Sequence, residues 1–111
     1  MPKLSLIVSI VRKGWGSTVL EASVKAGARG GTVLFGRGAG INEREKMFGV
    51  SIEPDTEILL TLVSASQVDT ILDAIVRAGE LNDTGGGIAF VVRVEKVAGV
   101  ARFMTQAKEQ Q

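Results

Sequence analysis

The most constraining feature of this sequence is a pattern that occurs twice, once on each side of a long aperiodic stretch at residues 36–56. Each half alternates a strand, a helix and a strand, with strands expected over residues 4–11, 32–35, 57–63 and 88–94. Two such halves are typical of the split βαβ, or ferredoxin-like (βαββαβ), arrangement. The sequence therefore predicts an α+β fold in which two helices cover one face of an antiparallel sheet.

The helices have start and stop signals of their own. Ser17 is the expected N-cap of the first helix, and Gly27 supplies its left-handed stop. The second helix is expected to open at residues 65–66 and to end at Gly79. It has the clearest helical periodicity in the chain, with an apolar stripe made of Val68, Ile71, Leu72, Ile75 and Val76.

The third and fourth strands are apolar on both of their faces. In residues 88–94 one alternating set is entirely apolar, and the opposite set still contains Ala89 and Val91. One pair of helices covers only one face of a sheet, so the second face is expected to pack against other subunits. The alternative is that these residues are ordinary exposed aliphatic side chains.

The composition disfavours several classes of function. The 111 residues include no cysteine and no histidine, so they provide neither a disulfide framework nor the usual ligands of zinc and copper. Without histidine, acid–base catalysis needs a carboxylate or lysine of shifted pKa, which disfavours an enzyme. A net charge of +1 is too small for typical nucleic-acid binding. With no long apolar run, we expect a cytoplasmic protein without a transmembrane segment.

Two glycine-rich segments are candidates for phosphate binding. Gly36, Arg37 and Gly38 follow the second strand, and residues 85–87 precede the fourth. Consecutive glycine amides can form a concave nest for phosphate oxygens, and arginine adds a forked cationic donor. For either segment taken alone, a tight turn that needs a positive φ is the simpler explanation. The long stretch at residues 36–56 is expected to be a functional loop.

With the motifs TVLFGRG at the second strand and TGGGIAFV at the fourth, the chain resembles the PII signal-transduction family over residues 3–103. The resemblance implies one domain over residues 1–103, a T-loop at about 37–56 and a polar tail at 104–111. It also implies a homotrimer with a nucleotide site in each cleft between subunits, and a T-loop that regulates a membrane transporter or a cytoplasmic enzyme.

The resemblance also assigns residues to these roles. The nucleotide-binding set that it implies is Ile7, Thr32, Gly36, Arg37, Gly38, Gly85, Gly86, Gly87 and Arg102. The charged loop segment around residues 43–48 is the candidate partner-binding surface, although a solvated loop tip explains it equally well; its residues are Glu43, Arg44, Glu45, Lys46 and Phe48. The implied effector is ADP, AMP or ATP, with no covalent cofactor.

Departures from the family pattern narrow this expectation. Residues 85–88 lack the aspartate and lysine of the family's B-loop, and Gly99 and Ala101 stand where the family commonly has arginines. Losing charged phosphate contacts weakens a triphosphate most, so ADP or AMP is expected to be favoured over ATP. Gly38 replaces a glutamine that helps to hold oxoglutarate in the family, and the absence of tyrosine excludes tyrosine uridylylation.

Two other functions stay open on the sequence. A small ferredoxin-like phosphohydrolase could use Arg37 and a nest of loop amides, but the sequence supplies no evident base. Glu80 and Asp83 could be a catalytic pair, although a polar loop rim explains them better. The third possibility is a trimeric scaffold that binds its partner through residues 36–56 without any nucleotide.

Overall fold

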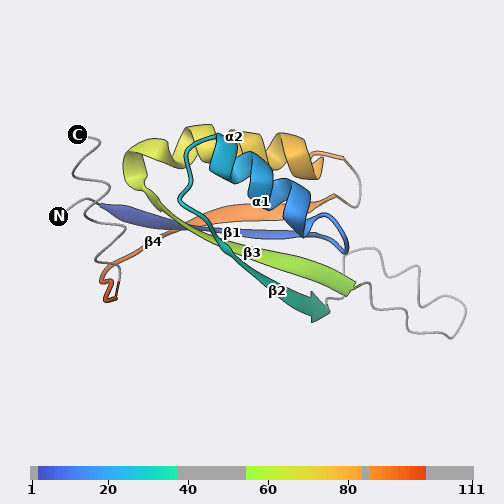
Figure 1. Cartoon of the computed structure of the whole chain (residues 1–111), viewed down its shortest axis with the longest axis horizontal. Coiled ribbons are helices and arrows are strands. Elements are labelled where there is room, and N and C mark those ends of the chain that lie inside the picture. Colours follow the sequence, from blue (N-terminus) through green and yellow to red (C-terminus); the bar gives the residue numbers. More distant parts are fainter. Residues whose placement is uncertain (1–2, 38–54, 84–85, 100–111) are drawn as a thin grey trace, which may run out of the picture.

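The computed structural model describes residues 3–37, 55–83 and 86–99, and the statements below refer to those residues. The elements follow the predicted order, which confirms the α+β, ferredoxin-like fold class (Figure 1). They are β1 (Leu4–Arg12), α1 (Gly16–Lys25), β2 (Thr32–Arg37), β3 (Asp55–Ser64), the short 3-10 turn η2 (Ala65–Gln67), α2 (Val68–Gly79) and β4 (Gly87–Arg93).

The four strands form one antiparallel sheet in the order β2-β3-β1-β4. In the register, Ile7 of β1 lies opposite Thr61 of β3 and Val91 of β4, so β1 and β3 are the central strands. Both helices lie on the same face of this sheet, next to each other (Figure 1). Each half of the chain therefore contributes one central strand, one edge strand and one covering helix.

The core lies between the sheet and the two helices. Side chains alternate between the faces of a strand, so every second residue of β1 and β3 points toward the helices. The sheet contributes Ile7, Val11, Leu59 and Val63, each almost fully buried. The helices contribute Val19, Ile71 and Ile75, which confirms the predicted apolar stripe of α2. Burial of each such side chain stabilises the fold by about 1.5–3 kcal/mol.

The opposite face of the sheet, which we call the open face, is also apolar. Side chains of directly opposed residues in antiparallel strands share a face, so the register identifies its members. They are Leu34 on β2; Ile58, Leu60 and Leu62 on β3; Leu6, Val8 and Ile10 on β1; and Ile88, Phe90 and Val92 on β4. In the described parts of the chain no helix covers this face (Figure 1). The prediction of two apolar faces is confirmed.

Helix α1 begins differently from the sequence prediction. It starts at Gly16 with Trp15 as its N-cap, so Ser17 lies inside the first turn and the Ser17 cap was wrong. The reason is a distant carboxylate: Glu57 of β3 is buried, accepts a hydrogen bond from the Gly14 amide and lies so close to Gly16 that a Cβ there would overlap it. The end of α1 was predicted correctly, because Gly27 has a φ of +123°.

Helix α2 also departs in detail from the expected boundaries. The 3-10 turn η2 occupies residues 65–67, where the helix was expected to open. The helix does end at Gly79, but the left-handed residue is Glu80, with a φ of +52°. Gly79 is needed for another reason: a Cβ there would lie 3.0 Å from Leu81 Cδ2 and 3.3 Å from Val19 Cγ2. This glycine lets the end of α2 pack closely on its neighbours.

The strands that flank the central aperiodic stretch are longer than the sequence predicted. Strand β2 continues through Gly36 to Arg37, and β3 already begins at Asp55. The expected loop at residues 36–56 therefore loses residues at both ends to the sheet. The remainder, residues 38–54, lies outside the described residues.

Candidate functional site

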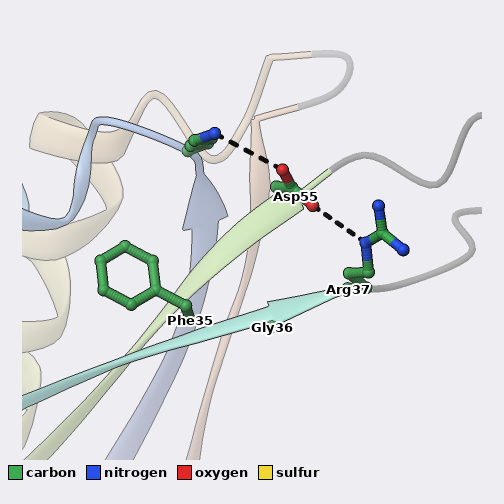
Figure 2. A pocket seen from close by; sticks show the side chains of 5 residues that line it. Phe35, Gly36, Arg37 and Asp55 are labelled. Atoms are coloured by element: carbon green, nitrogen blue, oxygen red, sulfur yellow. Dashed lines mark hydrogen bonds and ion pairs between the residues drawn. The ribbon is translucent and has the colours of Figure 1, made fainter.

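A cluster of three charged residues lies where β2 ends and β3 begins. Arg37 is the last residue of β2, and Asp55, the first of β3, is directly opposite it in the register. Arg37 Nε donates a hydrogen bond to Asp55 Oδ1 at 3.2 Å (Figure 2). Lys13, in the turn after β1, places its Nζ 3.5 Å from Asp55 Oδ2. Two cations thus converge on one carboxylate.

The cluster lines an open pocket of about 460 Å³, together with Phe35 and Gly36. Phe35 and Arg37 are two residues apart on β2, so their side chains leave the strand on the same side. Phe35 lies opposite Glu57 in the register, which identifies that side as the one that carries the helices. The Phe35 side chain is 79% exposed, an unusual position for a large aromatic residue. The pocket therefore combines an aromatic surface with two cations.

The electrostatics of the pocket favour an anion. The hydrogen bonds from Arg37 and Lys13 lower the pKa of the Asp55 carboxyl from its ordinary value of 3.8. Asp55 is therefore ionised at neutral pH, and the two cations still outnumber it. Arginine and lysine are the side chains that most often bind phosphate and carboxylate groups. What the arrangement can do chemically is hold an anionic group, since its one carboxylate is paired with both cations and its lowered pKa makes it a weak base.

The glycine-rich segment before β4 is largely explained by the fold. A Cβ on Gly86 would overlap the Glu80 carbonyl oxygen, and one on Gly87, whose φ is +126°, would overlap the Ile10 carbonyl oxygen. The Gly86 amide already donates to the Asp83 carbonyl oxygen at 2.9 Å. In this conformation, the Gly86 amide is thus committed to the turn rather than open to a phosphate.

The other expected contact residues lie in different places. Ile7 was expected near a base or ribose, but its side chain is fully buried among the helix-facing residues, where it offers no surface to a ligand. Thr32 is exposed at the opposite end of β2 from Arg37, about 16 Å away at the usual rise of a strand. Within one chain, Gly36 and Arg37 are neighbours at one end of β2, whereas Ile7 and Thr32 lie away from them.

The register shows how the two glycine-rich segments are related. Gly36 lies opposite Thr56, Thr56 lies opposite Arg12, and the preceding residue of β1, Val11, lies opposite Gly87. Both segments therefore lie at the same end of the sheet. Three strand spacings separate them, which is about 14 Å. One phosphate group cannot contact both segments of the same chain.

Several expected site residues lie outside the described residues. They are Gly38, Gly85 and Arg102 of the nucleotide-binding set and Glu43, Arg44, Glu45, Lys46 and Phe48 of the partner-binding set. Of the described site residues, the sequence reasoning missed Lys13, Phe35 and Asp55. The available signal was the length of β2 and β3, because extending both strands makes Arg37 and Asp55 neighbours.

Trp15 and Glu80, the two other candidate residues, have contacts typical of structural roles. Trp15 is half-buried against the core, and the Arg12 guanidinium lies 4.7 Å from the centre of its ring. Glu80 Oε1 lies 4.0 Å from Arg12 Nη1, at the rim of the sheet end. Within residues 3–37, 55–83 and 86–99, no three acidic side chains gather in a way that could hold a metal ion. No helix in those same ranges is long and apolar enough to span a membrane.

Three kinds of comparison with known proteins agree. The sequence model of the family described as nitrogen regulatory protein P-II matches residues 4–102. Nitrogen regulatory protein P-II 2 of Methanothermobacter thermautotrophicus is 33% identical over 97 residues, which cover 82% of this chain and 84% of that protein. A crystal structure of Arabidopsis thaliana PII bound to citrate superposes with a TM-score of 0.69 at 25% identity, covering 90% of this chain and 82% of the plant chain.

Proposed function

The chain belongs to the nitrogen regulatory protein P-II family, whose members are signal-transduction regulators rather than enzymes. From that premise we propose that it forms a homotrimer and binds ADP or AMP, in preference to ATP, between its subunits. We propose further that it acts in the cytoplasm, where it regulates a membrane transporter or a cytoplasmic enzyme. The regulated partner would dock on the segment at about residues 37–56. The observation that carries the proposal is the charged pocket around Arg37, at the end of the sheet from which that segment leaves.

The open face supports the trimer. Its side chains come from all four strands, and Leu34, Ile88, Phe90 and Val92 are each among the exposed large hydrophobic residues. Contiguous apolar surface of this kind on a soluble protein marks an interface with another protein. A second and third copy of the chain supply a matching apolar surface, and their packing removes it from water.

The distance between the glycine-rich segments suits a ligand longer than one phosphate group. Gly36 and Gly87 of one chain are about 14 Å apart, beyond the reach of a single phosphate group. A nucleotide held at Arg37 would therefore contact the turn before β4 through another of its groups, and a C-terminal segment of the neighbouring subunit would complete the site. The trimer would in that case complete the binding site and not only bury the open face.

The side chains available to phosphate support the nucleotide preference. Gly86 and Gly87 carry no charge, and the Gly86 amide donates to Asp83. Arg37 and Lys13 are the cations of the pocket. Each of the two cations can bind one phosphate group of ADP, but a third phosphate gains no additional charged partner from the described residues.

Isothermal titration calorimetry with ADP, AMP and ATP tests this function directly. Arg37→Ala is expected to weaken ADP binding roughly tenfold to hundredfold, the range for a charge-assisted hydrogen bond to phosphate. Lys25→Ala is the matched control, because Lys25 is exposed on α1 and pairs with Glu21 at 3.2 Å. Absence of binding by the wild type up to millimolar nucleotide would remove the nucleotide function, and tighter binding of ATP than of ADP would remove the preference.

A further inference from the structure

The three charges at the end of β2 have a geometry that suggests more than a structural ion pair. Arg37 donates to one oxygen of the Asp55 carboxylate, at 3.2 Å, and Lys13 approaches the other oxygen, at 3.5 Å. The three residues come from three places in the chain: the turn after β1, the end of β2 and the start of β3. Both cationic groups are therefore aimed at one point, and a carboxylate occupies it.

This point is open to solvent. The side chains of Lys13 and Arg37 are 67% and 71% exposed, and that of Asp55 is 44% exposed. Ion pairs between exposed side chains are weak, because water screens the charges and the side chains lose rotamer freedom when they pair. Figure 2 shows the terminal nitrogens of Arg37 turned away from Asp55, so an incoming anion can approach them before the Nε contact breaks.

We propose that Asp55 is an internal competitor: its carboxylate occupies the anion-binding position between Lys13 and Arg37, and a phosphate group must displace it in order to bind. This inference deepens the proposed function, on which it rests, by adding Lys13 as a ligand residue and Asp55 as the residue that sets selectivity. Asp55 acts through the two cations and does not itself contact the ligand.

The charges explain why a phosphate can displace the carboxylate. A terminal phosphate carries up to two negative charges and three acceptor oxygens, whereas a carboxylate carries one charge and two oxygens. A phosphate therefore gains more from the Lys13–Arg37 pair than Asp55 loses. A ligand with a single weak charge does not gain enough, so the competitor discriminates against such ligands.

The exchange also removes a side-chain link between two neighbouring strands. Asp55 and Arg37 are directly opposed, so their ion pair joins the last residue of β2 to the first residue of β3. When a ligand takes Arg37, this link between the two strands is lost. The exchange takes place where the chain leaves the sheet toward residue 38 and returns from residue 54, so ligand binding changes how these two strand ends are tied together.

Isothermal titration calorimetry on the full chain tests whether Asp55 competes with phosphate groups. The ligands are ADP, inorganic pyrophosphate and adenosine. Asp55→Asn removes the competing charge, so ADP and pyrophosphate are expected to bind roughly two- to fivefold more tightly, the range for an exposed ion pair. Lys13→Gln is expected to weaken both by a similar factor, and in the double variant the gain from Asp55→Asn should shrink. Adenosine, which has no phosphate, should bind equally to all variants.

Asp73→Asn is the matched control, because Asp73 is an exposed carboxylate on α2 that pairs with Arg77 at 2.7 Å and lies outside the pocket. It changes the net charge as Asp55→Asn does, and it should leave ADP binding unchanged. Thermal denaturation by circular dichroism shows that each variant is folded. A folded Asp55→Asn protein that binds ADP no more tightly than the wild type would overturn the inference while leaving the proposed function intact.

The same probes also show whether nucleotide binding can fail while the inference about Asp55 holds. If the wild type does not bind ADP but the Asp55→Asn protein binds pyrophosphate, the proposed nucleotide binding is refuted. The proposal that Asp55 blocks an anion site is then supported. If neither protein binds ADP or pyrophosphate, both proposals fall.

Discussion

Replacing Phe90 by aspartate tests most directly whether the open face is the interface between subunits. Phe90 lies at the middle of the edge strand β4, opposite Val8 on the open face, and 43% of its surface is exposed. A phenylalanine buries roughly 200 Å² when fully covered, so about 90 Å² of Phe90 is open to a neighbouring subunit. At ~25 cal/mol per Å², this surface contributes about 2 kcal/mol per chain, or about 6 kcal/mol per trimer.

The aspartate adds a second cost, because its carboxylate would have to leave water without a partner in the apolar interface. The apolar loss alone shifts the equilibrium between trimer and monomer by at least about four orders of magnitude. Phe90→Asp is therefore expected to be a monomer at micromolar concentrations. Sedimentation velocity measures the change directly.

The control variant is Val24→Asp. Val24 lies on α1, away from the open face, and at 45% exposed it is as accessible as Phe90. The same change in charge is therefore placed at an exposed apolar residue on the helical side of the molecule, where it should leave the trimer intact. A Phe90→Asp protein that stays trimeric, or dissociation by Val24→Asp alone, would refute the reasoning.

Three further predictions concern the stability of the fold. Thr61→Val should raise the free energy of unfolding by about 1–3 kcal/mol, because the Thr61 hydroxyl is fully buried and has no hydrogen-bond partner among the described residues. A lower free energy of unfolding for the variant, measured by urea denaturation, would show that this hydroxyl is hydrogen-bonded. Glu80→Gly should raise the free energy of unfolding by about 1 kcal/mol, because glycine adopts the left-handed φ of +52° without strain and the exposed pair of Glu80 with Arg12, at 4.0 Å, contributes little; equal stability of the two proteins would contradict this. The lowered pKa of Asp55 makes its stabilising contribution present above the ordinary value of 3.8 and lost as the pH falls through the lower folded-state pKa. Wild type should therefore melt at a higher temperature than Asp55→Asn at pH 7, and the difference should close in acid; a difference that grows in acid would reverse the sign.

The sequence predicted the fold because the order and periodicity of its elements are local properties. The stripe of α2 and the apolar runs of the strands need no knowledge of the rest of the chain. The two faces of β1 were harder to assign. Ser5 and Ser9 share a face with Ile7, and this face packs on the helices, whereas the purely apolar set of Leu6, Val8 and Ile10 lies on the open face.

The charged cluster could not be predicted in the same way. Asp55 is 42 residues from Lys13 and 18 from Arg37, and they meet only because the register of β1, β2 and β3 is fixed. The same reason explains the missed start of α1, where Glu57 contacts a turn more than forty residues earlier in the chain. A single charged residue at the start of an apolar strand was the only signal, since period two places Glu57 on the same face as Leu59.

The buried Glu57 has a consequence for how fast the site can respond. Asp55 and Glu57 lie on the same face of β3, and each holds one residue of the turn after β1, Lys13 and Gly14 respectively. When a ligand displaces Asp55, Glu57 still fixes the turn, so only exposed side chains have to move. Rotamer changes of exposed side chains take picoseconds to nanoseconds. Anion capture should therefore be limited by diffusion to the pocket and not by rearrangement of the backbone.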